Sequence, residues 1–365
     1  MKAVTLGAHS RPGRGRCHVG AAAVILSLLS ACSASAPPRL DASPSVPRLF
    51  SSVSLSRASL RGLCAVDARV AWTSGSGGAY GCTRDGGTRW TFNVVPGARM
   101  LDFRDVVAFD ANRAWLMSAG PGGASRIYRT DDGGRRWRMQ WKNPHTEGFL
   151  DGMDAWDDRR ALAYGDPVGG HMYVLRTDDG GRTWRRPPTS GMPRAHEGEA
   201  GFAASGTGVQ VSGSMTAWIA TGGAHVARVF RTTDGGVNWS VAETPLGDAS
   251  ASSGIFSFAF KDADNGVAVG GDYVHPARAH ANAAWTDDGG RTWHRPDIPP
   301  RGYRSGVAWL EGTEVLVCVG PTGTDVSTDA GRTWRPSSDD GYHGVRVTDG
   351  GGYASGSRGR LAALR

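Results

Sequence analysis

Carboxylate, tyrosine, arginine and histidine side chains gather in glycine-rich segments that have no counterpart elsewhere in the chain. These segments read NPHTEGFLDG, GDPVGGHM, PRAHEGEAG, GGDYVHPARAHAN, RGYRSG and DDGYHG. Two facing carboxylates can act as general acid and base in the cleavage of a glycosidic bond. Alongside arginine and tyrosine, they can instead hold a polar partner by hydrogen bonds and ion pairs. The candidates for either role are Asp105, Asp151, Asp166, Glu199, Asp272, Tyr273, Arg304, His343 and Arg358.

Metal and cofactor chemistry lacks the patterns that it requires. A zinc site needs several ligands that converge on one ion, and the chain has no HExxH motif or closely spaced ligand pair. It also has no dinucleotide-binding fingerprint, no haem-attachment CxxCH and no CxxC pair. We therefore predict no metal and no cofactor, and we interpret the loop histidines as solvated residues: His145, His171, His196, His275 and His280.

Six copies of one octapeptide supply the frame for these residues. They read TRDGGTRW, TDDGGRRW, TDDGGRTW, TTDGGVNW, TDDGGRTW and STDAGRTW, and they end 47, 47, 55, 54 and 41 residues apart. This period is typical of β-propeller blades. In each copy the Asp can accept backbone N–H bonds across a tight turn, and the Gly pair permits positive φ. The Trp can bury apolar area between neighbouring sheets. We assign these residues structural roles: Asp85, Trp90, Asp132, Trp137, Asp179, Trp184, Asp234, Trp239, Asp288, Trp293, Asp329 and Trp334.

The octapeptide resembles the Asp box, S/T-x-D-x-G-x-T-W, which is also called the bacterial neuraminidase repeat. The fuller form TDDGGRTW is similar to the repeat of photosystem II stability/assembly factor-like propellers. The copies depart from the pattern where Arg89, Arg136 and Asn238 replace Thr and where Ala330 replaces the first Gly. The resemblance covers nearly all of the chain after residue 47. Because functionally unrelated propellers share the box, it specifies the fold far better than the partner.

Each repeat reads as four short β runs with the box between the third and the fourth. Complete blades are predicted to start at Leu60, near FRDVVAFD, at Gly152, at Gly201, at Gly254 and at Ser305. After Trp334 only three runs remain, so the missing fourth strand must come from elsewhere. The segment from Arg48 to Leu55 alternates apolar and polar residues and can pair with the C-terminal strand. We therefore predict an all-β, seven-bladed β-propeller over residues 48–365, with six Asp-box blades and a seventh closed by the N-terminal strand.

This topology predicts where the candidate residues lie. The turns that carry the boxes fall on one face of a propeller, and the loops between blades open on the other face, around the central channel. We expect the nine candidate residues near the mouth of that channel, where propeller loops commonly bind ligands.

The first 47 residues do not read as part of the propeller. Arginines at positions 11, 14 and 16 precede an apolar run from Val19 to Leu29, and this last leucine begins the sequence LSAC, which ends at Cys32. This pattern resembles a bacterial lipoprotein signal peptide over residues 1–31, with Cys32 as the lipidated N-terminus. Residues 32–47 are rich in Ser, Ala and Pro and are predicted to form an extended tether. We expect anchoring in the cell envelope, on the periplasmic face of the outer membrane.

Composition narrows the range of partners. The chain has 41 basic and 34 acidic residues, but four basic residues lie in the predicted signal peptide. The small excess of basic over acidic residues in the rest of the chain does not indicate a nucleic-acid partner. Cys64, Cys82 and Cys318 remain after the signal and anchor cysteines, and this odd number argues against a disulfide framework. Since Cys64 and Cys82 read as the first and third strands of one blade, we predict free thiols.

Two functions remain open. The resemblance to assembly-factor propellers implies a non-enzymatic protein that binds a protein or peptide partner on its channel face. The alternative is a glycoside hydrolase, similar to sialidases or xyloglucan-cleaving enzymes, that acts on a glycan through Asp151, Asp166 and Glu199. A sialidase also needs three arginines around a substrate carboxylate. Arg304, Arg358 and Tyr273 supply some of these residue types, but no Arg-Ile-Pro-like motif is present.

Overall fold

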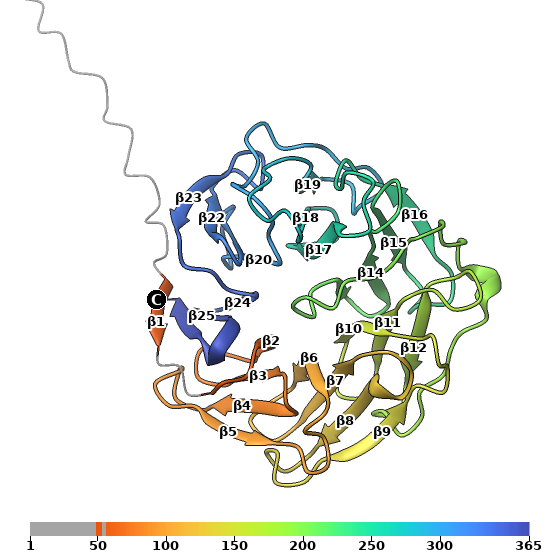
Figure 1. The fold of residues 1–365 in the computed structure, drawn as a ribbon, viewed down its shortest axis with the longest axis vertical. Coiled ribbons are helices and arrows are strands. Elements are labelled where there is room, and N and C mark those ends of the chain that lie inside the picture. The colour runs from red at the N-terminus through yellow and green to blue at the C-terminus, as the bar shows by residue number, and fades with distance from the viewer. Residues whose placement is uncertain (1–48, 53–55, 365) are drawn as a thin grey trace, which may run out of the picture. The chain divides into compact units, whose positions relative to one another are not determined.

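The strands of this protein form seven antiparallel sheets that stand around a common axis (Figure 1). The computed structural model describes residues 49–52, as backbone only, and residues 56–364. The predicted signal peptide, Cys32 and the tether lie outside the described residues. All described residues belong to one unit, and no described helix is long and apolar enough to cross a membrane.

Each sheet is one blade, and its first strand lies nearest the axis (Figure 1). Blade 1 contains β2 (Leu60–Ala65), β3 (Ala71–Gly75), β4 (Ala79–Thr83) and β5 (Thr91–Val94). Blade 2 contains β6 (Asp102–Ala108), β7 (Ala114–Ala119), β8 (Arg126–Thr130) and β9 (Arg138–Lys142). Blade 3 contains β10 (Leu150–Ala155), β11 (Ala161–Gly165) and β12 (Tyr173–Thr177). Blade 4 contains β13 (Val209–Ser212), β14 (Thr216–Ala220), β15 (Arg228–Thr232) and β16 (Ser240–Glu243).

Blade 5 contains β17 (Ser253–Phe260), β18 (Gly266–Asp272) and β19 (Ala283–Thr286). Blade 6 contains β20 (Gly306–Trp309), β21 (Leu316–Gly320), β22 (Gly323–Ser327) and β23 (Arg335–Ser338). Blade 7 contains β24 (Gly344–Thr348), β25 (Gly351–Ser355), β26 (Leu361–Leu364) and β1 (Leu49–Ser52). Three one-turn 3-10 helices, Gly122–Ala124, Thr189–Gly191 and Ser357–Gly359, lie in the described connections.

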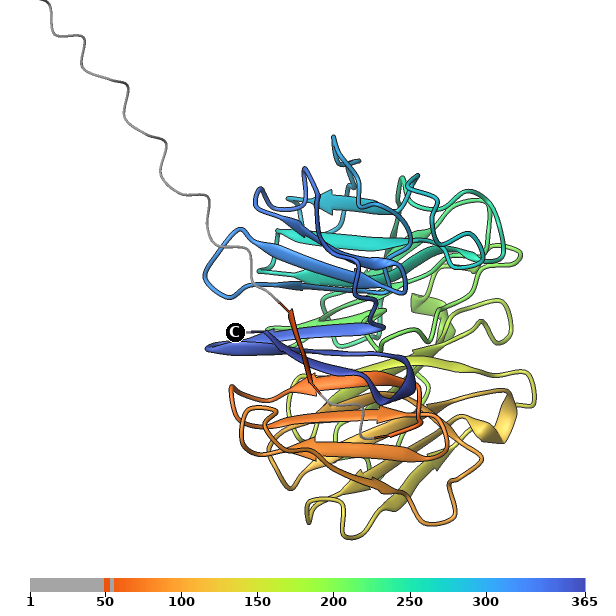
Figure 2. The ribbon, with the colours of Figure 1, turned by 60° about the vertical axis from the view of Figure 1, so that its left-hand side comes forward.

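The two ends of the propeller meet in blade 7, which confirms the predicted closure. β1 pairs antiparallel with β26, with Leu49 opposite Leu364 and Ser52 opposite Leu361. Figure 2 shows the orange-red β1 running beside the blue C-terminal strands. Because β1 precedes blade 1 in the chain, its pairing joins the first blade to the last. The fold class is therefore a seven-bladed β-propeller.

The repeated octapeptide forms the same turn in all six copies. In the third copy, Asp179 Oδ1 accepts hydrogen bonds from Thr177 Oγ1 and from the backbone N–H of Thr183, both at 2.9 Å. Gly180 and Gly181 have φ of +77° and +76°, which glycine adopts without steric cost. These hydrogen bonds from the turn lower the pKa of Asp179 to about 2. Ala330 keeps the same left-handed conformation, with φ of +57°, although it carries a Cβ.

The tryptophan that ends each copy packs against the preceding blade. The ring of Trp137 in blade 2 lies 5.1 Å from the ring of Tyr80 in blade 1. Trp184 lies 6.0 Å from Trp115 of blade 2, and Trp90 of blade 1 lies 6.0 Å from the ring of Tyr353 in blade 7. Such aromatic contacts stabilise neighbouring sheets beyond the area that they bury. The repeat therefore supplies both the turn within a blade and the contact between blades.

Two of the predicted blades lack a regular fourth strand. In blades 3 and 5 this strand is reduced to a single bridge, Arg176 with Arg185 and Trp285 with His294. Prolines follow each bridge closely, at Pro187 and at Pro296. Proline has no N–H to donate to a ladder, so the strand ends there.

The predicted start of blade 4 was also wrong. We expected it at Gly201, but β13 begins at Val209. Residues 201–208 instead form a loop, which becomes part of the candidate site.

Cys64, Cys82 and Cys318 are free, as predicted. Burial raises the pKa of both the Cys64 and the Cys82 thiol to about 11.

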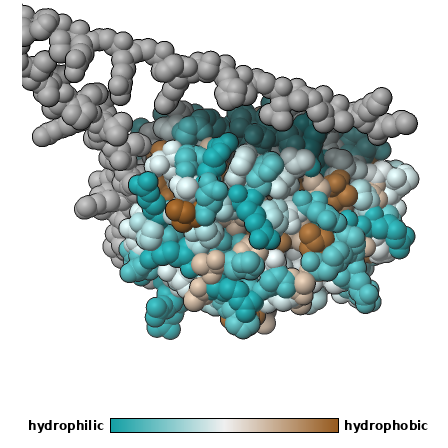
Figure 3. Space-filling model, turned by 90° about the horizontal axis from the view of Figure 1, so that it is seen from above, coloured by the Kyte–Doolittle hydropathy of each residue, from teal (hydrophilic) through white to brown (hydrophobic). Residues whose placement is uncertain are grey.

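Figure 3 views the rim of the propeller, where hydrophilic residues dominate and hydrophobic residues appear as isolated spots. Single exposed apolar residues of this kind are normal on a protein surface.

Candidate functional site

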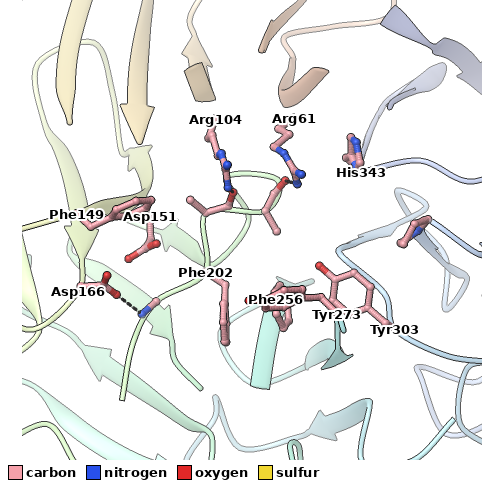
Figure 4. A pocket seen from close by; sticks show the side chains of 14 residues that line it. Arg61, Arg104, Phe149, Asp151, Asp166, Phe202, Phe256, Tyr273, Tyr303 and His343 are labelled. Carbon is pink, nitrogen blue, oxygen red and sulfur yellow. Dashed lines mark hydrogen bonds between the residues drawn. The ribbon is translucent and has the colours of Figure 1, made fainter. Parts of the chain in front are cut away.

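A pocket of about 560 Å³ opens at the end of the inner strands (Figure 4). Its volume lies within the usual range of ligand sites, about 300–1,000 Å³. Arginines and a histidine lie along one side, two carboxyl groups lie on another, and aromatic rings lie opposite the arginines. The lining residues are Arg61, Arg104, Phe149, Asp151, Asp166, Gly201, Phe202, Ala203, Ala204, Phe256, Tyr273, Tyr303, Pro321 and His343.

β-Bulges in the inner strands position four of these side chains. The pairing of the first two strands shifts register at Arg61 in blade 1, at Arg104 in blade 2, at Asp151 in blade 3 and at Phe256 in blade 5. A bulge places an extra residue in one strand and re-aims its side chain. At each of these four positions the extra residue lines the pocket.

Close packing at the axis explains the residue that follows the bulge in blade 1. A Cβ on Gly62 would lie 2.1 Å from Ser74 Oγ and 2.9 Å from the backbone of Asp105 in blade 2. No side chain fits there, so glycine is required.

The loop of residues 201–208 lies across the channel and lines part of the pocket. The carbonyl oxygen of Ala203 accepts a hydrogen bond from Arg104 Nη1 at 3.0 Å, and that of Ala204 accepts one from Arg61 Nη1 at 3.4 Å. Ser205 Oγ donates to the carbonyl of Ser305 in blade 6 at 2.6 Å. The loop thus connects blades on opposite sides of the axis.

The basic side of the pocket carries uncompensated positive charge. Arg104 forms a salt bridge with Asp102 at 2.8 Å, but Arg61 forms none with the residues that the structure describes. Burial, together with the charge of Arg104, lowers the pKa of Arg61. Burial and both arginines lower the pKa of His343 to about 4, so this imidazole is neutral at pH 7. Its Nε2 lies 3.2 Å from Ser59 Oγ.

The acidic side consists of Asp151 and Asp166. Burial, together with the neighbouring Asp166, raises the pKa of Asp151 well above its ordinary value, and burial raises that of Asp166 as well. Ionisation of these two groups is therefore less favourable than that of a carboxyl group in water. Asp166 Oδ1 accepts a hydrogen bond from the Gly201 N–H at 3.0 Å. Asp151 is buried, and its carboxyl group lies close enough to the Asp166 side chain and the Ala203 backbone N–H for both to act on its pKa.

The aromatic side is a cluster of four rings from the 201–208 loop and from blades 5 and 6. Phe202 stacks on Phe256 with ring centroids 4.0 Å apart. The edge of Tyr303 meets Phe256 at 4.7 Å, and Tyr273 lies 6.0 Å from the same ring. Tyr303 and Phe256 are buried, whereas Tyr273 is 51% exposed. We call these four residues the aromatic shelf.

Four of the nine predicted site residues line this pocket: Asp151, Asp166, Tyr273 and His343. Asp105 does not, which corrects its expected position. It follows the bulge at Arg104 and is buried, and its Oδ2 accepts a hydrogen bond from the Met153 N–H of blade 3 at 2.7 Å. Burial raises its pKa to about 8. Its contacts connect neighbouring blades.

Glu199 and Arg304, expected at the channel mouth, are instead buried in ion pairs. Glu199 forms a salt bridge with Arg228 and accepts a hydrogen bond from Thr221 Oγ1 at 2.6 Å. Arg304 is fully buried and donates from Nε to Asp325 Oδ2 at 2.7 Å. Neither residue lines the pocket, because each pairs with a charged partner that lies at least 20 positions away in the chain.

Asp272 and Arg358 also lie off the pocket wall. Asp272 is buried beneath its own loop, where it accepts hydrogen bonds from Ser252 Oγ at 2.7 Å and from the Val274 N–H at 2.9 Å. Burial by itself would raise its pKa, but hydrogen bonds, with His275 foremost, lower it to about 2. Arg358 is exposed, with a left-handed φ of +53°, in the turn before β26.

Three of the pocket residues that sequence reasoning missed, Arg61, Arg104 and Phe256, share a position in the repeat with Asp151 and His343. Each stands before a small residue and an apolar one at the start of an inner strand. The tripeptides are Arg61-Gly62-Leu63, Arg104-Asp105-Val106, Asp151-Gly152-Met153, Phe256-Ser257-Phe258, Ser305-Gly306-Val307 and His343-Gly344-Val345. Aligning the blades on this tripeptide would have identified Arg61, Arg104 and Phe256.

Comparison with known proteins identifies structural neighbours but no sequence relative. No protein-family model matches the chain, and no curated protein matches it. A solved structure described as YCF48 bound to D1 peptide superposes with a TM-score of 0.60 and 16% identity, over 89% of this chain and 98% of that one. YCF48 from Cyanidioschyzon merolae gives a TM-score of 0.57 and 17% identity, over 87% and 98% of the two chains. The chain shares its fold with YCF48.

The burial of Glu199 predicts a structural rather than a chemical role. Glu199→Ala leaves Arg228 buried without its counter-charge, which costs about 3–5 kcal/mol of the free energy of unfolding. Glu197→Ala, at an exposed position in the same loop, should change it by less than about 0.5 kcal/mol. Denaturant unfolding of both variants measures the difference. Equal stabilities would show that the buried pair does not support the fold.

Proposed function

We propose that this protein is a non-enzymatic propeller that binds a protein or peptide partner in the pocket on its channel face. The observation that supports this proposal most strongly is the composition of the pocket wall. Three features face one cavity: a partly buried arginine, Arg61, that forms no salt bridge with the described residues, the buried carboxyl group of Asp151, and the aromatic shelf, of which Tyr273 is half-exposed. Burying polar groups without partners costs free energy, and a bound chain with amide, carboxylate and apolar groups would offset it.

The structural neighbours support the same reading. One of them, YCF48, was solved with a D1 peptide, so a propeller of this fold can bind a peptide. The sequences are too different for the identity of that peptide to be transferred. The proposal therefore rests on the pocket of this chain and names a class of partner.

Photo-crosslinking from the pocket tests the proposal. A photoreactive amino acid replaces Tyr273 in the full-length protein, in cells that produce it naturally. A matched variant carries it in place of Met139 on the outer strand β9. Both positions are 51% exposed, so non-specific collisions should label them equally. We expect a discrete protein adduct from position 273 that is several-fold weaker or absent from position 139.

The same adduct should disappear when Arg61→Glu is added to the position 273 variant. Arg135→Glu, an exposed change on a box turn at the other end of the strands, should leave it intact. Adducts of equal strength from both crosslinker positions, or none from position 273, would refute binding in this pocket.

We further propose that the protein is a lipoprotein of the bacterial cell envelope, anchored at Cys32 and facing the periplasm from the outer membrane. The support is the order of arginines, apolar run and LSAC in the first 32 residues. Labelling of cells with a radioactive fatty acid should mark the wild-type protein and leave Cys32→Ser unlabelled. Equal labelling of the two proteins would exclude this anchor.

A glycoside hydrolase remains the second candidate, because Asp151 and Asp166 lie in one pocket with shifted pKa values. Such shifts are typical of catalytic acids and bases. Glu199, the third carboxylate considered, is withdrawn because Arg228 neutralises it away from the pocket. The binding proposal predicts that the full-length protein hydrolyses none of a panel of fluorogenic glycosides in a way that depends on these two residues. Any background turnover should be unchanged in Asp151→Asn and in Asp166→Asn. Turnover that either substitution abolishes would establish the hydrolase.

A further inference from the structure

We propose that Arg61, Arg104 and His343 form a subsite for a carboxylate group, and that the aromatic shelf beside it holds an apolar side chain of the same ligand. This inference rests on the proposed peptide-binding function and specifies the chemistry of the partner. The ligand is an extended peptide segment in which a carboxylate adjoins a large apolar or aromatic residue. The carboxylate comes either from an Asp or Glu side chain or from the peptide's C-terminus.

The charges around the pocket favour an anion. Arg61 has hydrogen-bond donors left over after its single bond to the Ala204 carbonyl. Arg104 forms a salt bridge with Asp102, and the two carboxyl groups lie on another side of the pocket from the arginines. Arginine is the side chain best suited to hold a carboxylate, because its planar donors match the two oxygens.

The geometry separates the two halves of the ligand. Figure 4 shows the guanidinium groups of Arg61 and Arg104 extending into the pocket, with His343 beside them. The aromatic shelf lies on the opposite side, below the backbone of the 201–208 loop. Tyr273, one of the exposed large apolar residues of the described chain, belongs to this shelf and is 51% exposed. A ligand side chain laid on the shelf would cover part of this apolar surface.

Small probes test the two features separately. Titration calorimetry with N-acetyl-phenylalanine and with its uncharged amide reports on a terminal carboxylate. The blocked dipeptides acetyl-Glu-Phe-amide and acetyl-Gln-Phe-amide report on a side-chain carboxylate. We expect the acid of at least one pair to bind about tenfold more tightly than its neutral counterpart, since a charge-assisted hydrogen bond accounts for roughly that factor.

Variants assign this preference to the subsite. Arg61→Gln should abolish it, Arg61→Lys should keep part of it because the charge remains, and Arg135→Gln on a box turn should leave it unchanged. A second readout is the NMR titration of His343, identified by its loss in His343→Asn. The groups that face this ring are Ser59, Arg61 and Arg104. Burial lowers the pKa of His343 to about 4, with both arginines adding to the shift, so a bound carboxylate that offsets the arginine charges should raise this pKa.

The proposal is overturned if both acids bind no better than their neutral counterparts, including the case in which no probe binds at its solubility limit. It is also overturned if Arg61→Gln retains the full preference. These outcomes differ from failure of the proposed function. Acid-selective binding without any crosslinked partner would support the subsite and refute the proposed binding of a protein or peptide. A crosslinked partner whose binding does not depend on Arg61 would support the proposed function and refute the subsite.

Discussion

The pairing of β1 with β26 is the interaction on which the rest of the structure depends. A blade of four strands cannot bury its own faces, and each sheet is stabilised by stacking on its neighbours. Without β1, blade 7 would end in an unpaired edge, and the contact between blades 7 and 1 would rest on side chains and a few loop bonds. One of those bonds, from the Leu60 N–H to the Gly356 carbonyl at 3.0 Å, lies at the start of the strand that carries Arg61.

The closure also assembles the basic side of the pocket. Arg61 belongs to blade 1 and His343 leads into blade 7, so these two groups face each other across the junction of the chain ends. The contact between Ser59 and His343 spans 284 positions of the sequence. A binding site built across this junction exists only while the propeller is closed. The proposed carboxylate subsite therefore depends on ring closure.

The fold followed from local chemistry that the sequence displays openly. The Asp, Gly pair and Trp of each octapeptide define a turn and an inter-blade contact, and the three unmatched strands after Trp334 required the segment near Leu49. The site was harder to predict because a β-bulge moves the pocket residue by one position. Asp105 was chosen where Arg104 faces the pocket, and a shift of one residue reverses the face of a strand.

Other errors came from interactions between distant parts of the chain. Glu199 and Arg304 read as free loop charges, but Arg228 and Asp325 neutralise them in the interior. The residues from Gly201 to Gly208 read as a strand because they precede a regular blade, yet their contacts with Arg61, Arg104 and Ser305 hold them across the channel. No local sequence pattern predicts these interaction partners, because they come together only in the closed propeller.

Disulfide trapping across the closure tests this account most directly. Phe50 lies opposite Ala363 in the β1–β26 register, and directly opposed strand residues are close enough for a disulfide. We predict that mild oxidation of the full-length Phe50→Cys, Ala363→Cys protein links these two positions, as seen by mass spectrometry of the joined peptides. Phe50→Cys with Ala362→Cys, one residue out of register, should not link. No link in the first protein, or equal linking in both, would contradict the closed seven-bladed propeller and the binding pocket built upon it.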